Sequence, residues 1–309
     1  MIKKYIIAID LGGTNLKIAV LNLNLNILRK EIIATRTFRT KVSLIESIVD
    51  SVNAIIARYH LKKRDVLGIG LGVPGPVDHK SGVVHFFPNI PGWKEVKLRD
   101  ILQRKVGLPV TLDNDAKAMA LAEYTLGRAK NASNALCITL GTGVGGGIII
   151  GKKIYRGKNN AAGEIGHLPI NENGPRCNCG GLACLEAYIG NKRILKQARK
   201  IFQRKISLEE LSLLAKQKHR KAVRIWKEIG RHLGVALSAV INLMNPDVIV
   251  IGGGVANSGK VLFSAVRETI KERAMSLQAR QVKVLKAKLG SDAGLFGAAI
   301  MLKQERALR

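Results

Sequence analysis

Residues 5–21 read YIIAIDLGGTNLKIAVL, and residues 135–150 read ALCITLGTGVGGGIII. In each stretch a run of Ile, Val and Leu stops at a glycine turn and then resumes, which predicts two strands joined as a hairpin. A third strand is expected at Ile27–Ala34, and apolar residues then recur at helical spacing over Leu44–Tyr59. Because one design occurs twice, we expect two related α/β domains with a ligand between them.

The rest of the chain continues this alternation. The apolar run Asp65–Val73 ends at Pro74-Gly75-Pro76, where the chain must turn. Late in the sequence a strand at Val248–Ile251 leads into Gly252-Gly253-Gly254. Helices are expected between these strands, at Gly190–Phe202, Leu208–Lys218 and Ala222–Leu243.

The composition is that of a globular protein with a strong excess of positive charge. With 309 residues and 47% hydrophobic content, the chain can form one large domain or two ordinary ones. The 51 Lys and Arg against 22 Asp and Glu give a net charge of +29. Many basic residues lie between Lys192 and Arg231, in a helical pattern that indicates a solvated face, with a polyanion contact as the alternative. Only two aromatic residues, Phe202 and Trp226, lie among these charges, too few for a series of stacked bases, so nucleic acid is not the expected partner.

Neither a membrane span nor an export signal is expected. The most hydrophobic stretch, Leu233–Gly254, is broken by Asn242, Asn245 and Asp247. The N-terminal apolar run is interrupted by Asp10, and no small-residue cleavage site follows it. We therefore expect a cytoplasmic protein in which the four cysteines stay reduced.

Three of the four cysteines and one histidine have the spacing of a metal site. They follow the pattern H-x9-C-x-C-x4-C, formed by His167, Cys177, Cys179 and Cys184. Three thiolates and one imidazole complete a tetrahedral set with no open position for substrate, so the sequence predicts a structural zinc ion. Four unrelated reduced cysteines are the alternative.

The glycine turns suggest phosphate binding. Gly141-Thr142-Gly143-Val144-Gly145-Gly146 matches the dinucleotide fingerprint by letter, but Ile148–Ile150 indicates a following strand where that fingerprint needs a helix. Glycine turns between strands still expose N–H groups that can cradle phosphate, although each turn alone is equally compatible with a plain hairpin. Asp10, just before the first turn, is a candidate Mg²⁺ ligand, directly or through water.

Carboxylates elsewhere suggest catalysis and sugar binding. Asp113-Asn114-Asp115 lies between an apolar strand pattern and a helical one, so one member can cap the helix while another accepts a proton from an attacking hydroxyl. Glu164 and Glu186 bracket the predicted zinc cluster, where they can accept hydrogen bonds from sugar hydroxyls. Surface charge is their alternative role.

With these motifs the chain resembles the ROK family, and within it the glucokinase-like sugar kinases, from about residue 5 to about residue 300. Asp10-Leu11-Gly12-Gly13-Thr14-Asn15-Leu16-Lys17 is similar to the family's first phosphate motif, and Gly141–Gly147 to its second. Ala183 departs from the family pattern, which usually has Gly before the last cysteine. The other similar motifs are Gly72–Asp78 with Gly75, Pro88-Asn89, Asn114-Asp115-Ala116, Gly163–His167, Cys177–Glu186 and Gly252-Gly253-Gly254.

The resemblance implies an actin-like (ribonuclease H-like) ATPase fold, with two α/β domains around a cleft. We expect a small domain at residues 1–115, joined by a C-terminal helix at 294–309, and a large domain at 116–293. The implied general base is Asp115. The implied sugar contacts are Gly75, Asn89, Asn114, Glu164, His167 and Glu186, with His167 also on zinc. The implied nucleotide contacts are Asp10, Gly12, Gly13, Thr14, Asn15, Lys17, Gly141, Thr142, Gly143 and Gly252–Gly254.

The expected activity is phosphorylation of a hexose by ATP with Mg²⁺, glucose to glucose 6-phosphate first among the candidates, in a homo-oligomer. N-acetylmannosamine, fructose, mannose and allose are alternative substrates. A non-catalytic sugar sensor and a nucleic-acid-binding protein are the alternatives from other classes. The family's repressors carry a winged-helix domain before the kinase body; because the first phosphate motif starts at Asp10, we expect no such domain here.

Overall fold

The computed structural model describes residues 3–12, 15–34, 38, 40–87 and 90–307. The chain divides into two compact units, each built from more than one segment. The first unit comprises residues 1–122, 156–162 and 291–309, and the second comprises residues 123–155 and 163–290.

The first unit is built on a five-stranded sheet of order β3-β2-β1-β4-β8. The predicted hairpin is confirmed: Asp10 pairs with Lys17 and Leu11 with Leu16 across an antiparallel ladder. Two further strands then add in parallel to β1, so the sheet is mixed. The strands are β1 (Tyr5–Leu11), β2 (Asn15–Asn22), β3 (Ile27–Ala34), β4 (Val66–Val73) and β8 (Val110–Asn114).

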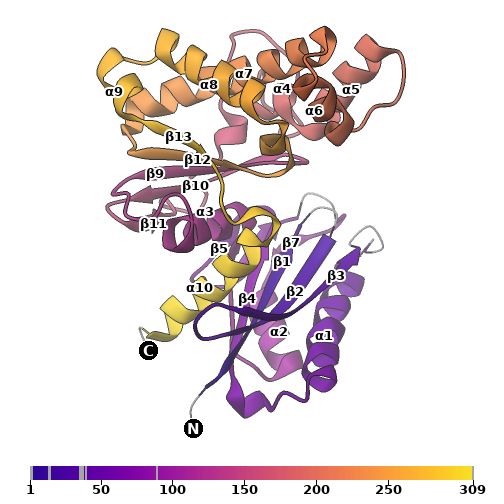
Figure 1. Cartoon of the computed structure of the whole chain (residues 1–309). Helices are drawn as coiled ribbons and strands as arrows, with labels where there is room; N and C mark the ends of the chain where they lie inside the picture. Colours follow the sequence, from indigo (N-terminus) through magenta and orange to yellow (C-terminus); the bar gives the residue numbers. More distant parts are fainter. Residues whose placement is uncertain (1–2, 13–14, 35–37, 39, 88–89, 308–309) are drawn as a thin grey trace. The chain divides into compact units, whose positions relative to one another are not determined.

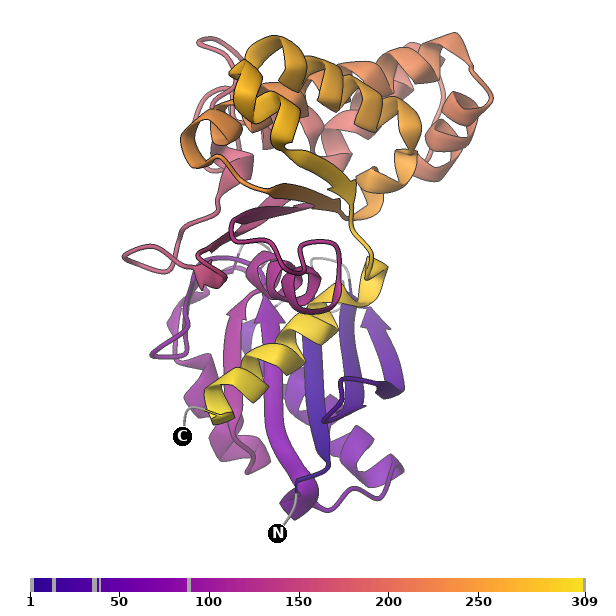
Figure 2. The ribbon, with the colours of Figure 1, turned by 60° about the vertical axis from the view of Figure 1, so that its left-hand side comes forward.

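Helices cover both faces of this sheet. Helices α1 (Lys41–Arg58) and α2 (Leu98–Val106) lie on one face, and α10 (Ala293–Ala307) crosses the other, in front in Figure 2. Glycine at position 70 of β4 lets α10 lie close against the sheet, because any Cβ there would overlap the carbonyl group of Ala298 in α10. Smaller elements complete the unit: η2 (Lys63–Asp65), η5 (Gly290–Asp292) and a three-stranded sheet of β5 (Val77–Asp78), β6 (Val83–Phe86) and β7 (Lys94–Val96).

The second unit repeats the same sheet plan. Its order is β11-β10-β9-β12-β13, in which β9, β10 and β11 are antiparallel neighbours and β12 and β13 add in parallel. Each strand thus has a counterpart in the first sheet, and the repeated strand–glycine turn–strand pattern predicted the hairpin of each sheet. The strands are β9 (Ala135–Leu140), β10 (Val144–Ile150), β11 (Lys153–Tyr155), β12 (Val248–Gly252) and β13 (Lys283–Lys286).

A layer of helices packs on the second sheet (Figure 1). The buried Trp226 of α7 shares one apolar cluster with Ile138 of β9 and Ile249 of β12. No helix among the described residues is long and apolar enough to cross a membrane. The elements are α4 (Glu186–Ile189), α5 (Asn191–Phe202), α6 (Leu208–Lys216), α7 (Arg220–Met244), α8 (Lys260–Arg273), α9 (Ser276–Gln281), η3 (Ile165–His167) and η4 (Gly254–Ser258).

A buried carboxylate joins two distant stretches of the second unit. Glu123, in helix α3 (Asp115–Leu126), is fully buried. Its Oε1 accepts hydrogen bonds from the backbone N–H groups of Lys288 and Leu289, both at 2.8 Å, and its Oε2 accepts one from Arg128 at 2.9 Å. Residues 122/123 and 290/291 mark unit boundaries, so Glu123 ties together two places where the chain passes between units.

Candidate functional site

The predicted metal ligands come together in the second unit. The ligand atoms of His167, Cys177, Cys179 and Cys184 all lie within 4.8 Å of one another. The Cys177 Sγ is 3.8 Å from His167 Nδ1, and the Cys179 Sγ is 3.7 Å from the Cys184 Sγ. Zinc–sulfur bonds of about 2.3 Å imply tetrahedral edges of about 3.8 Å, so these separations fit one tetrahedral zinc ion.

Backbone turns bring the thiols to this position. Cys177 and Gly181 pair through a backbone hydrogen bond of 2.9 Å, and Gly180 donates to the Cys177 carbonyl oxygen at 3.0 Å. The Gly181 N–H also donates to the Cys179 Sγ at 3.4 Å, which lowers the pKa of that thiol and favours the thiolate a metal needs. The residues of the cluster thus have the chemistry of a metal ligand set.

Ala183, the one visible departure from the family pattern, occupies a left-handed conformation. Its φ is +55°, a region that residues with a Cβ adopt at a cost and that glycine adopts freely. Its side chain is fully buried beside the metal ligands. The conformation gives a physical reason for the glycine usually present there, and the Ala183 methyl group leaves all four ligands in place.

Glu186 links the metal loop to the second glycine turn. It begins α4, two residues after Cys184, and its Oε2 accepts a hydrogen bond from the Val144 N–H at 2.8 Å. Gly143 makes room for this contact, because a Cβ there would overlap the carboxylate oxygen and lie 3.2 Å from Glu186 Cδ. The turn itself is closed by a hydrogen bond from Gly141 N–H to the Gly143 carbonyl oxygen at 2.9 Å. The predicted nucleotide residues Gly141 to Gly143 therefore adjoin a predicted sugar residue.

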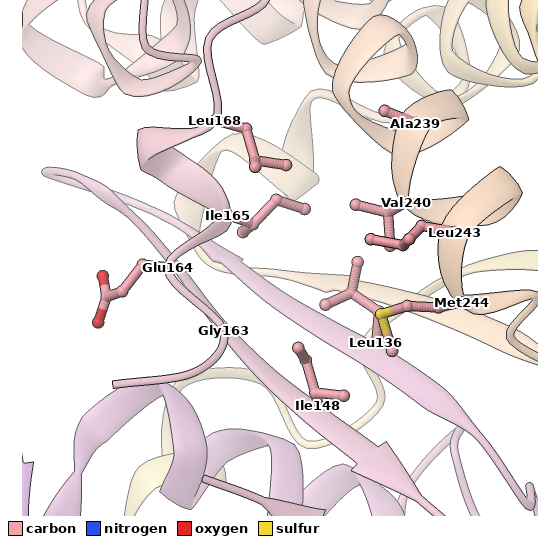
Figure 3. A pocket seen from close by; sticks show the side chains of 10 residues that line it. All are labelled: Leu136, Ile148, Gly163, Glu164, Ile165, Leu168, Ala239, Val240, Leu243 and Met244. Carbon is pink, nitrogen blue, oxygen red and sulfur yellow. The ribbon is translucent and has the colours of Figure 1, made fainter. Parts of the chain in front are cut away.

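Glu164 comes before the metal loop in the chain, whereas Glu186 follows it. It is exposed, and Figure 3 shows its carboxylate pointing away from an apolar pocket of about 240 Å³. The pocket lies between β9, β10 and the end of α7, where Leu136, Ile148 and Val240 line it. Its walls offer few polar groups for sugar hydroxyls, so the pocket differs chemically from the carboxylate-bearing loop beside it.

In the first unit, Asn114 has the capping role that the sequence left open. Its Oδ1 accepts hydrogen bonds from the N–H groups of Ala116 at 3.0 Å and Lys117 at 3.2 Å, at the start of α3. Its Nδ2 donates to the Gly75 carbonyl oxygen at 3.0 Å, so two predicted sugar contacts are joined. Asp115 is the first residue of α3 and is half-buried, and its Oδ1 accepts from the Ala116 N–H at 2.8 Å.

Asp113 has partners that could not be predicted from its sequence motif. This carboxylate is fully buried, and its Oδ2 accepts a hydrogen bond from Arg156 Nε at 2.8 Å. Its Oδ1 accepts from the Asn114 N–H at 2.8 Å. Arg156 follows β11 with no motif around it, so its sequence context does not indicate this pairing. Once Asp113 is known to be buried, a charged partner is expected for it.

Asp10 lies beside the start of α10. Lys17 Nζ is 3.5 Å from its Oδ2 and also donates to the Ser291 carbonyl oxygen. Any Cβ at Gly294 would overlap the Asp10 carboxylate, so the carboxylate packs against the first turn of α10. Burial raises the pKa of Asp10, and the charge of Lys17 opposes that shift.

The remaining predicted nucleotide contacts lie at strand ends. Gly12 donates to the Asn15 carbonyl oxygen at 2.9 Å, which closes the first turn, whereas Gly13 and Thr14 lie outside the described residues. The predicted sugar contact Asn89 also lies outside them. Thr142 is exposed in the second turn. Gly252 ends β12, and the exposed Gly253 and Gly254 lead into η4 and α8.

Comparisons with known proteins identify the family to which the chain belongs. Residues 6–305 match the ROK family. A glucokinase of Halalkalibacterium halodurans is 34% identical, over 99% of this chain and 97% of the relative. The xylose repressor of Caldicellulosiruptor bescii is 31% identical, over 96% of this chain and 77% of the relative. The crystal structure of a ROK family glucokinase from Streptomyces griseus with glucose and AMPPNP is 33% identical, with a TM-score of 0.84 over 97% of this chain and 99% of that one. From the match over nearly its whole length, the chain belongs to the ROK family.

Proposed function

We propose that this chain is an ATP-dependent sugar kinase that transfers the γ-phosphoryl group of ATP to a hexose hydroxyl, with glucose at its 6-hydroxyl as the first candidate. Family membership and 34% identity to a glucokinase support the class of reaction. The observation that carries the proposal is the cap at the start of α3. Asn114 accepts hydrogen bonds from two N–H groups there, so the helix keeps a cap that does not depend on Asp115, and Asp115 is assigned the chemistry.

Asp115 acts as the general base in this proposal. A carboxylate at this position accepts the proton of the attacking hydroxyl, an assistance typically worth about 10²–10⁴-fold in rate. The proposed sugar contacts are Gly75, Asn89, Asn114, Glu164, His167 and Glu186. His167 directs Nδ1 towards the Cys177 Sγ, so a bound metal fixes the ring and leaves Nε2 for a sugar hydroxyl.

The nucleotide contacts are proposed from the two glycine turns and the Gly252–Gly254 segment. Backbone N–H groups in such turns stabilise charge on phosphoryl oxygens. Asp10 is the proposed Mg²⁺ ligand, and Mg²⁺ when bound neutralises charge on the phosphates. Zinc is the proposed occupant of the four-ligand cluster, with a structural role because the ligand set is complete.

The test is an ATP-coupled assay over hexoses and N-acetylhexosamines with the wild-type protein and Asp115→Asn. We expect turnover with glucose, and a loss of at least about 100-fold in kcat for the variant while sugar binding remains measurable. An Asp115→Asn protein that turns over at nearly the wild-type rate would refute the assignment. Turnover with N-acetylmannosamine or fructose instead of glucose would correct the substrate and keep the reaction.

A sugar-sensing role is the second candidate, because a xylose repressor is 31% identical over 96% of this chain. Sensing requires sugar binding without phosphoryl transfer. Calorimetric binding of xylose or glucose by a wild-type protein that turns over none of the sugars would favour this role. We also propose a homo-oligomer, which light scattering after gel filtration would detect.

A further inference from the structure

The buried carboxylate of Asp113 depends on one nearby guanidinium. Both carboxylate oxygens are engaged, Oδ1 by the Asn114 N–H and Oδ2 by Arg156 Nε, each at 2.8 Å. His79 is the other basic group nearby, with Nδ1 3.9 Å from Oδ2. That Nδ1 is only 2.9 Å from the Leu112 carbonyl oxygen, to which it donates. Arg156 is therefore the close charged partner among the described residues, and its planar group fixes the direction as well as the charge.

Arg156 belongs to a short segment that packs with a different unit from the residues before and after it. Residues 156–162 belong to the first unit, whereas the residues on both sides belong to the second. A second tie is made by Asn160, whose Nδ2 donates to Asp78 Oδ1 at 3.1 Å. The Ala162 N–H donates to the Arg156 carbonyl oxygen at 3.0 Å and closes the segment into a loop. Two side chains thus attach the loop to the first unit at separate acids.

The ion pair acts directly on the residues that start α3. Asp113 fixes the N–H of Asn114, and the Asn114 side chain caps the helix whose first residue is Asp115. A shift of the Asp113 carboxylate is therefore passed to Asp115 through consecutive peptide units. A buried ion pair is also a poor device for stability alone, because well-packed neutral residues at such sites are often equally stable.

We infer that Arg156 is a positioning residue for the proposed general base: by holding Asp113 it sets the placement of Asn114 and Asp115 at the start of α3. The inference rests on the proposed kinase function. It assigns to Arg156 a larger effect on the chemical step than on sugar affinity, since Asp115 is the reacting group whereas Asn114 is one of six proposed sugar contacts. A displacement of about 1 Å at a reacting group costs about 100-fold in rate.

The experiment measures kcat, and sugar Kd without nucleotide, for five variants. Arg156→Met is expected to lower kcat about 10- to 100-fold and to raise sugar Kd by a clearly smaller factor. Arg156→Lys keeps the charge but not the planar geometry and is expected to lose less, yet more than about threefold. The matched control is Asn160→Ala, which breaks the loop's other tie and is expected to stay within about twofold of the wild-type kcat.

The last two variants, Asp113→Asn alone and Asp113→Asn with Arg156→Met, test whether Arg156 acts through Asp113. If it does, Arg156→Met costs less than about threefold in kcat when added to Asp113→Asn, because the two residues form one unit. The same cost in both backgrounds would overturn the inference. So would equal effects of Arg156→Met and Asn160→Ala, which would indicate general loosening of the loop. If Arg156→Met fails to fold, wild-type kcat in Arg156→Lys overturns the inference and the partial loss supports it.

The wild-type rate separates this inference from the proposed function. A wild-type protein inactive on all the sugars refutes the kinase proposal, and the assignment of Arg156 falls with it. An active wild-type protein with unaffected Arg156 variants refutes only the positioning role.

Discussion

Gly143→Ala is the sharpest test of how the second glycine turn and the metal loop cooperate. Gly143 has no positive φ, so alanine is compatible with its backbone, but the new Cβ would overlap Glu186 Oε2. The overlapped atom is the end of a flexible side chain. The fold can therefore accommodate the methyl group by moving the carboxylate, and the free energy of unfolding should fall by no more than the contribution of the one hydrogen bond that this movement breaks.

The main expected effect of Gly143→Ala is a displaced Glu186 carboxylate. Moving the carboxylate breaks its 2.8 Å hydrogen bond from the Val144 N–H. Hydrogen bonds to charged groups contribute about 1.5–3 kcal/mol. If Glu186 binds the sugar from this position, restoring that position on binding costs the same amount, which corresponds to a loss of about 10- to 100-fold in sugar affinity.

Calorimetric titration of sugar without nucleotide measures this loss. Gly141→Ala is the matched control for sugar binding, because a Cβ at Gly141 meets nothing within 4 Å. In the background of Glu186→Ala, Gly143→Ala should add little further loss, since its target is already gone. Unchanged sugar affinity in Gly143→Ala, or equal losses in the two glycine variants, would refute the reasoning.

Two other predictions concern stability. Glu123→Ala should lower the free energy of unfolding by at least about 3 kcal/mol, because it leaves three backbone N–H groups without their buried acceptor; urea denaturation measures it, and a change below about 1 kcal/mol would contradict the role of Glu123. Metal analysis after dialysis should find one zinc ion per chain. Cys177→Ser should lower that ratio and the melting temperature together, whereas a stable, active and zinc-free wild-type protein would count against the cluster.

Local patterns predicted the elements whose signal lies in neighbouring residues. Both glycine-turned hairpins and the ligand set around Cys177–Cys184 follow from spacing alone, and the structure confirms that these groups form. The short strand β13 and the three-stranded sheet β5-β6-β7 were missed, because two to four residues carry too little periodicity.

Contacts between residues far apart in the sequence could not be predicted from it. Arg156 meets Asp113 across 43 positions, and Glu186 meets Val144 across 42. In each case the partner is a charge or an N–H group that every region of the chain supplies. Only the folded sheet decides which ones meet, so the pairing of these groups could not be read from spacing.

The place of α10 affects the order in which the protein can fold. This helix is made from residues 293–307, yet it covers a face of the sheet formed by the first 114 residues. During synthesis that face stays bare until residues 293–307 have left the ribosome. Transiently exposed apolar surface of this kind promotes aggregation. Truncations that remove the last fifteen residues should therefore depend on chaperones for solubility much more than the full-length protein does.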